Sequence, residues 1–313
     1  MRHFLSVNDI DNPKAWIRMA RELKANPRNF SELGKEKTLG LLFFNNSLRT
    51  RLSTQKAAFN LGLHCMIMNF GNEGWSLEFE DGTVMDTGKA EHIREAAGVV
   101  SQYCDILGIR AFASLTDKEK DEAEVVMNGF RNHATIPILN MESATGHPLQ
   151  ALADMMTIAE TSTKKKPKVV LSWAPHPKAL PHAVANSFIE AMQCYKEVDF
   201  SITHPPGYEL NPAITKDVPI YYDQDKALKE ADYVYVKNWS SYTPYGKVLT
   251  TDPKWMITPE KLGAANFMHC LPVRRNVVVK DAVLNSEQSL VLAQANNRTY
   301  AAQTALKKLL ESL

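Results

Sequence analysis

Short apolar segments alternate with longer amphipathic segments along almost the whole chain, and this alternation restricts the fold more than any other feature of the sequence. Thr38–Phe44 is an apolar run compatible with a fully buried strand, and the segment from Thr50 to Leu61 follows it as a helix. Buried strands that alternate with helices are typical of parallel sheets covered on both faces. We therefore predict an α/β fold with two doubly wound parallel-sheet domains.

Two series of elements follow from this alternation, separated by a charged, proline-terminated turn at Lys164–Pro167. In the first series we predict strands at 38–44, 65–68, 105–109 and 136–139 and helices at 50–61, 91–103 and 118–132. An amphipathic segment at 148–160 precedes the turn. In the second series we predict strands at 169–173, 198–203, 233–236 and 265–269 and helices at 183–193, 224–230 and 299–313.

These series define a first domain, residues 1–145, and a second domain, residues 146–295. The C-terminal stretch 296–313 is expected to pack back on the first domain as a helix. Ligands of open α/β sheets collect at the carboxyl ends of the strands, so a cleft between the two domains is the expected ligand site.

Composition excludes several classes of protein. The chain has 313 residues, of which 44% are hydrophobic and 23% charged, and its net charge is +1, so neither nucleic acid nor an anionic membrane is an expected partner. No apolar run approaches the length of about 18 residues that a membrane span needs. Met1–Asp9 becomes polar too early for a signal peptide, and the four cysteines form no CxxC pair, so we expect a cytoplasmic protein with reduced thiols and no zinc site.

A polar turn leads from the first predicted strand into the sequence Ser47–Arg51, where a helix begins. The first turn of a helix has free backbone N–H groups and the positive end of the helix dipole, which together attract anions. Hydroxyl groups and two arginines at this helix start add donors and permanent charge. An ordinary helix start whose arginines pair with surface carboxylates is the alternative interpretation.

The five residues Ser47–Arg51 resemble the phosphate loop of the aspartate and ornithine carbamoyltransferase family. His147–Gln150 and His269–Pro272 match two further motifs of that family in the same order, so the resemblance covers nearly the whole chain. It implies a homotrimer with shared active sites, small-molecule substrates, and neither a metal nor a cofactor.

The resemblance also implies which residues bind carbamoyl phosphate. Arg49, Arg110 and His147 would be catalytic, with Arg110 and His147 polarising the carbonyl group. Trp75 would reach the site from a neighbouring subunit. The complete set expected to bind carbamoyl phosphate is Ser47, Leu48, Arg49, Thr50, Trp75, Arg110, His147, Gln150, Cys270, Leu271 and Arg298.

The second substrate is indicated by differences within the family. Ornithine enzymes carry a Ser-Met-Gly loop that this chain lacks, and Lys237 lies in that region instead. A lysine would bind a carboxylate and repel a free α-ammonium group, which favours an N-acylornithine. The residues that match the acyl-ornithine pocket of this branch are Glu142, His176, Lys237, Leu271 and Arg274. The same branch implies a knotted second domain, with the proline-rich segment Ala174–Pro181 as the loop through which later chain passes.

Ala90 bears on the identity of the acyl group. Acetyl-specific relatives have a glutamate at the matching position, and succinyl-specific relatives have a proline. Like Trp75, Ala90 would reach the active site of a neighbouring subunit. Alanine leaves room and adds no negative charge, which favours N-succinylornithine. N-acetylornithine is the next alternative, followed by ornithine and by a non-catalytic relative that only binds carbamoyl phosphate.

Overall fold

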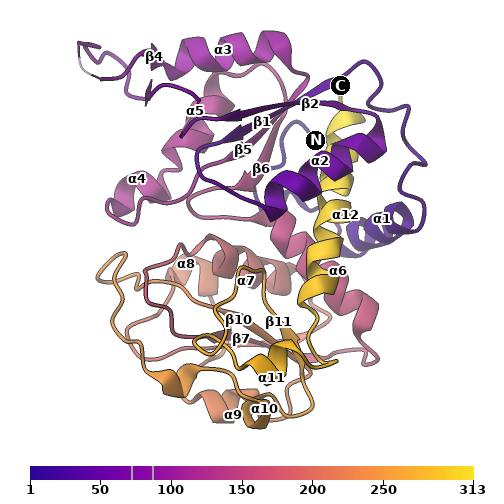
Figure 1. Ribbon diagram of the computed structural model, residues 1–313, viewed down its shortest axis with the longest axis vertical. Helices are drawn as coiled ribbons and strands as arrows, with labels where there is room; N and C mark the ends of the chain where they lie inside the picture. Colours follow the sequence, from indigo (N-terminus) through magenta and orange to yellow (C-terminus); the bar gives the residue numbers. More distant parts are fainter. Residues whose placement is uncertain (72, 87) are drawn as a thin grey trace. The chain divides into compact units, whose positions relative to one another are not determined.

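Every strand pairing in residues 1–71, 73–86 and 88–313, the part of the chain that the computed structural model describes, is parallel. These residues form two compact units, each built around its own larger sheet (Figure 1). Unit 1 comprises Met1–Ser114, Glu119–Leu149 and Arg298–Leu313, and unit 2 comprises Leu115–Lys118 and Gln150–Asn297. The predicted α/β class with parallel sheets is confirmed.

Unit 1 contains a four-stranded sheet with the order β2-β1-β5-β6. Its strands are β1 (Thr38–Phe43), β2 (His64–Asn69), β5 (Ile106–Arg110) and β6 (Ile138–Glu142). A separate two-stranded pair joins β3 (Leu77–Glu78) to β4 (Glu91–His92). Five of the six residues of β1 are buried, as expected of a central strand covered on both faces.

The helices of unit 1 cover both faces of this sheet (Figure 1). They are η1 (Val7–Asp9), α1 (Pro13–Ala25), α2 (Arg49–Leu61), α3 (Ile93–Tyr103), α4 (Lys118–Glu122), α5 (Val125–His133) and part of α12 (Val291–Leu310). Leu107 and Ile138 share a core with Ile93 of α3 and Phe130 of α5. The side chain of Asn60 in α2 donates to Gln303 Oε1 in α12 over 3.0 Å, so these two helices are joined.

Unit 2 contains a five-stranded sheet with the order β11-β10-β7-β8-β9. The strands are β7 (Lys168–Trp173), β8 (Asp199–Thr203), β9 (Ile220–Tyr221), β10 (Tyr233–Lys237) and β11 (Asn266–Met268). Its helices are α6 (Pro148–Thr161), α7 (Ala183–Tyr195), α8 (Pro212–Thr215), α9 (Gln224–Leu228), η2 (Pro253–Trp255), α10 (Pro259–Leu262), α11 (Asp281–Leu284) and the start of α12. The division between the units falls inside α4, inside α6 and inside α12.

Alternation along β10 explains how the helices of unit 2 divide between the two faces of the sheet. The ring of Tyr235 stacks on Phe188 of α7 with 4.1 Å between ring centroids. Val234 and Val236 point the other way, into a core shared with α9, α10 and α11. Since successive side chains of a strand face opposite sides, one strand serves both layers.

Several details differ from the predicted elements, and the helices α1, α8, α10 and α11 were not predicted. The helix expected at 118–132 is two helices, because Glu124 has a left-handed backbone conformation with φ of 49°. The C-terminal helix begins at Val291 rather than at residue 299. The strands β3, β4 and β9 were not predicted, since each has only two residues and therefore no readable period.

The C-terminal end of helix α2 is fixed by close packing, which matters because the first turn of this helix carries the predicted anion site. At its C-terminal end Gly62 has φ of 82°, and a Cβ there would lie 1.9 Å from the backbone oxygen of Ser31. Only glycine fits such a close backbone approach at positive φ.

None of the described helices is both long and apolar enough to cross a membrane.

Candidate functional site

The carboxyl ends of β1, β5 and β6 meet at one edge of the unit 1 sheet, and the predicted anion-binding residues gather there. Arg110 is the last residue of β5, Glu142 is the last residue of β6, and β1 leads into the start of α2. Thr50 of α2 and His147 are almost fully buried at this edge, at 1% and 2% exposure. These residues come from distant parts of the sequence, as is typical of sites in open α/β sheets.

The hydroxyl group of Thr50 accepts two hydrogen bonds from arginines. Arg110 Nη1 lies 3.2 Å from Thr50 Oγ1, and Arg298 Nη2 lies 2.6 Å from the same atom. A threonine hydroxyl has two acceptor lone pairs and one donor hydrogen. Because both lone pairs are used, the hydrogen is available to an anion at this edge.

Positive charge exceeds negative charge among these buried groups. Arg110 forms an ion pair with Glu142, while Arg298 donates to His147 Nε2 over 3.3 Å. The buried Nε of Arg110 has no hydrogen-bond acceptor among the described residues. Burying charge is costly, so two guanidinium groups that converge on one buried hydroxyl favour a bound anion.

His147 is neutral in this environment. Burial lowers its pKa well below the ordinary histidine value of 6.5, and the charges of Arg298 and Arg110 lower it further. Its Nε2 lies 3.5 Å from Glu142 Oε2. A neutral imidazole can form hydrogen bonds to a ligand here without adding a further positive charge.

The remaining residues of the predicted phosphate loop have different environments. The backbone N–H of Thr50 donates to Ser47 Oγ over 3.2 Å, so Ser47 caps the helix. Leu48 is 67% exposed, and Arg49 is the first residue of α2. The guanidinium of Arg51 lies 5.4 Å from the ring centroid of Phe43, where it makes a cation–π contact.

Trp75 and Ala90 lie on the excursion that contains β3 and β4. The indole Nε1 of Trp75 donates to Glu91 Oε2 over 2.8 Å, and Ala90 N donates to Ser76 O over 3.1 Å. Trp75 is 58% exposed. The two residues predicted to act in a neighbouring subunit are therefore held together on one exposed segment.

In unit 2, the predicted carbamoyl-binding residues are arranged around a buried carboxylate. Asp154 Oδ1 accepts from Gln150 Nε2 over 2.7 Å and from Gln294 Nε2 over 2.9 Å. Gln294 in turn accepts from the backbone N–H of His269. Asp154 thereby connects Gln150 to the segment that precedes Cys270.

The His269–Pro272 segment has a tightly defined backbone. The N–H of Leu271 donates to His269 Nδ1 over 2.8 Å, and Leu271 has a positive φ of 57°. The peptide bond between Leu271 and Pro272 is cis. Cys270 is buried beside Tyr235, whose pKa is raised well above 10 by burial and by the neighbouring Asp154 and Cys270.

The predicted acyl-ornithine residues of unit 2 form a cationic cluster. Arg274 Nε donates to His176 Nε2 over 2.9 Å, and His176 Nδ1 lies 2.9 Å from Lys178 O and 3.1 Å from Lys178 N. Burial lowers the pKa of His176, and the charges of Arg274, Lys237 and Lys178 lower it further. Three cations around one neutral histidine suit a ligand that carries carboxylates.

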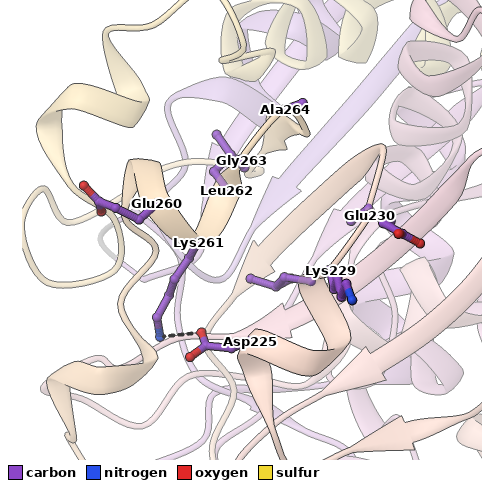
Figure 2. A pocket seen from close by; sticks show the side chains of 10 residues that line it. Asp225, Lys229, Glu230, Glu260, Lys261, Leu262, Gly263 and Ala264 are labelled. Carbon is purple, nitrogen blue, oxygen red and sulfur yellow. Dashed lines mark ion pairs between the residues drawn. The ribbon is translucent and has the colours of Figure 1, made fainter.

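A hollow of about 530 Å³ lies elsewhere in unit 2, between α9 and α10 (Figure 2). Its ten lining residues include none of the predicted substrate-binding residues. The side chain of Lys261 lies 3.6 Å from Asp225 and also donates to Gln224 Oε1. Its charge is thus already compensated, and the hollow gives no argument for a ligand.

Two residues in these networks were not predicted from the sequence. Asp154 lies four residues after Gln150, a helical spacing that places both side chains on one face, so it could have been found. Gln294 had no such signal, because it contacts Asp154 from 140 positions later in the chain. Among the described residues, no group of three or more histidines, cysteines or carboxylates is placed to hold a metal ion.

Comparison with known families agrees with this arrangement. Residues 2–160 match the model of the aspartate/ornithine carbamoyltransferase carbamoyl-P binding domain, and residues 181–309 match that of the aspartate/ornithine carbamoyltransferase Asp/Orn binding domain. The chain belongs to the aspartate/ornithine carbamoyltransferase family. Thr50 and Arg110 lie within the residues that match the carbamoyl-P binding domain, whereas Arg298 lies outside them.

Curated relatives within this family cover the full chain. The chain is 47% identical to the N-succinylornithine carbamoyltransferase of Bacteroides fragilis (strain 638R), with 100% of both chains covered. It is 46% identical to the enzyme of that name in Bacteroides thetaiotaomicron, again over 100% of both chains. It is 34% identical to the N-acetylornithine carbamoyltransferase of Xylella fastidiosa (strain 9a5c), over 99% of this chain and 98% of that protein.

Solved structures give the same family. N-acetylornithine transcarbamylase complexed with acetylcitrulline superimposes with a TM-score of 0.90 at 32% identity, covering 99% of both chains. A mutant of N-acetyl-L-ornithine transcarbamylase, with one glutamate replaced by alanine, was solved with carbamyl phosphate and N-succinyl-L-norvaline. It has a TM-score of 0.89 at 32% identity, covering 99% of this chain and 100% of that chain.

The role of the Thr50 hydroxyl can be tested with a matched pair of variants. Thr50→Val removes the atom on which two arginines converge, and we expect kcat/KM for carbamoyl phosphate to fall about 100-fold, as for the loss of one transition-state donor. Thr54→Val, one turn later, removes a buried hydroxyl with no hydrogen-bond partner among the described residues. Its kcat/KM should be unchanged and its free energy of unfolding equal or higher by about 1 kcal/mol. Equal activity of the two variants would contradict this role.

The lowered pKa of His147 predicts a pH-dependent stability. His147 binds a proton near pH 6.5 in the unfolded chain and only at lower pH in the folded chain. The stabilisation that comes from a neutral His147 is therefore complete above pH 6.5 and is lost as the pH falls below that value. Compared with His147→Gln, the wild type should lose up to about 1.4 kcal/mol of unfolding free energy per pH unit below that value. Urea unfolding from about pH 8 to about pH 5 measures the difference. Parallel curves for the two proteins would exclude a depressed pKa.

Proposed function

We propose that the protein transfers the carbamoyl group of carbamoyl phosphate to the δ-amine of N-succinyl-L-ornithine, giving N-succinyl-L-citrulline and phosphate. The observation that carries this proposal is the presence of two separate cationic sites. One lies around Thr50, Arg110 and Arg298 and suits a phosphate. The other lies around His176 and suits carboxylates.

The reaction forms one bond and breaks one bond. The lone pair of the δ-amine attacks the carbonyl carbon, a C–N bond forms, and the C–O bond to phosphate breaks with its electrons leaving on the phosphate. The nitrogen then loses a proton, which the departing phosphate accepts. Arg110 and His147 would polarise the carbonyl oxygen, and Arg49, Thr50 and Arg298 would stabilise the charge on the departing phosphate. No metal or cofactor is required by this scheme.

On the unit 2 side, Gln150 and the backbone near Cys270 and Leu271 would accept from the carbamoyl NH₂ group. The hydrogen bond from Gln150 to Asp154 supports this role, because it holds the amide in one orientation. The δ-amine must be unprotonated to attack, so the rate is expected to rise through the mildly alkaline range.

The preference for a succinyl group is supported by three observations. The N-succinylornithine carbamoyltransferases are 46–47% identical to this chain, whereas the N-acetylornithine enzymes are 33–34% identical. Ala90 carries no charge that would repel a second carboxylate. Lys178, Lys237 and Arg274 around His176 offer more positive charge than the single carboxylate of N-acetylornithine would need.

The proposal also includes the oligomeric state of the enzyme, its cellular location and its metabolic role. Trp75 and Ala90 would act in the site of a neighbouring subunit within a homotrimer, and the exposed position of Trp75 supports this. Glu142, Leu271 and Arg274 would complete the acyl-ornithine pocket. A cytoplasmic location, a role in arginine biosynthesis, a cleft between residues 1–145 and 146–295, and the knot belong to the same proposal.

A substrate panel tests the proposed reaction. With carbamoyl phosphate as donor, we expect kcat/KM for N-succinylornithine to exceed that for N-acetylornithine by about tenfold or more, the value of one additional charged hydrogen bond. Free ornithine should be slower still. Equal or better turnover of ornithine would contradict the acyl-specific assignment, and tight carbamoyl phosphate binding without turnover of any amine would indicate a non-catalytic relative.

Ala90→Glu tests the origin of the acyl preference. A carboxylate at this position repels the succinyl carboxylate, so the ratio of kcat/KM for succinyl over acetyl substrate should fall about tenfold or more. Ala90→Gln is the matched control, since it adds the same bulk without the charge. An unchanged ratio in Ala90→Glu would remove Ala90 from the specificity argument, and an equal fall in both variants would assign the effect to size.

A further inference from the structure

The carboxylate of Glu124 is surrounded by donors from a single loop in unit 1. Ser143 Oγ lies 2.6 Å from Glu124 Oε1, and the backbone N–H of Thr145 lies 2.8 Å from the same oxygen. The Thr145 hydroxyl also donates to Oε1, and the N–H of Ala144 lies 3.2 Å from Oε2. One side chain thus accepts four hydrogen bonds from three consecutive residues.

This loop, residues 143–146, connects two residues of the candidate site. Glu142 precedes it and pairs with Arg110, and His147 follows it and contacts Arg298. The loop also closes on itself, since Ser143 N donates to Gly146 O over 2.8 Å and Gly146 N donates to Ser143 Oγ over 3.2 Å. Its shape therefore determines where Glu142 and His147 stand relative to each other.

The backbone of Glu124 is itself unusual. Glu124 precedes α5 (Figure 1), has φ of 49° and ψ of 45°, and its side chain makes no capping bond to that helix. A left-handed conformation is unfavourable for a residue with a side chain, and it persists where surrounding contacts determine it. The four bonds to the loop are such contacts, and they explain why the predicted helix 118–132 is interrupted here.

We infer that Glu124 is a positioning residue for carbamoyl transfer: it holds the loop 143–146 so that Glu142 and His147 keep their contacts with the two buried arginines. Glu124 acts through these residues and does not itself contact substrate. The inference rests on the proposed function, because it assigns Glu124 a part in the same reaction.

The inferred role predicts an unequal effect on the two stages of the reaction. Arg110 and Arg298 keep their own hydrogen bonds to Thr50 when the loop is loosened, so binding of the phosphate group should change little. The placement of His147 should suffer, because the loop that leads to it is loosened. The loss should therefore appear mainly in kcat and only slightly in phosphate affinity.

Glu124→Ala and Glu124→Gln test this, with Asp223→Ala as the control. Asp223 caps α9 in unit 2 by accepting from Lys226 N over 3.1 Å, so its loss also removes a carboxylate at a helix start. We expect kcat to fall about 10–100-fold in Glu124→Ala, the range typical of a lost supporting contact. Glu124→Gln keeps one of the two acceptor oxygens and should lie between this variant and wild type, and it replaces Glu124→Ala as the test if the latter does not fold.

Two measurements separate positioning from general stability. Inorganic phosphate affinity, by calorimetry, should stay within about twofold of wild type, while amide hydrogen exchange should speed up at Ala144 and Thr145. Asp223→Ala should keep wild-type kcat and wild-type exchange in this loop. A Glu124 variant with wild-type kcat, or with unchanged exchange at Ala144 and Thr145, would overturn the inference.

The exchange measurement does not depend on turnover. If the wild type carbamoylates none of the acylornithines, the proposed function fails, whereas faster exchange at the loop in Glu124 variants would still show that Glu124 holds it. If the wild type is active and the Glu124 variants keep its kcat, the positioning role fails alone.

Discussion

The convergence of Arg110 and Arg298 on the hydroxyl of Thr50 is the interaction on which the rest of the candidate site depends. It gathers two permanent charges at a buried edge of a parallel sheet, where Glu142 pairs with Arg110. Two buried guanidinium groups this close together favour a bound anion. Burial lowers the pKa of His147, and the charges of Arg298 and Arg110 lower it further, so the histidine adds no positive charge to this edge.

The alternating pattern of the sequence predicted the fold well because its signals are local. A buried apolar run followed by an amphipathic segment specifies a strand and a helix within about twenty residues, and β1 and α2 lie where that pattern indicated. The helix expected at 118–132 was wrong for the opposite reason. Its break at Glu124 is caused by hydrogen bonds to residues 143–145, which no local pattern reveals.

The candidate site was predictable in part. A helix start with hydroxyls and arginines indicates an anion site from the residues alone, but the approach of Arg298 to Thr50 spans 248 positions and was expected only through family resemblance. The pair Gln150 and Asp154 shares one helical face and could be read locally, whereas Gln294 could not. Contacts of this kind depend on topology, so their residues carry no mark in the sequence.

Helix α12 has a consequence for the order in which the protein can be made. Asn297 and Arg298 are neighbours in the chain, yet Asn297 belongs to unit 2 and Arg298 to unit 1. When residues 1–149 have been translated, the sheet of unit 1 therefore still lacks Arg298, one of the two guanidinium groups that converge on Thr50. Ligand binding stabilises only a state that can bind. A phosphate bound at the proposed site would therefore stabilise unit 1 during synthesis only after the whole of unit 2 has been translated.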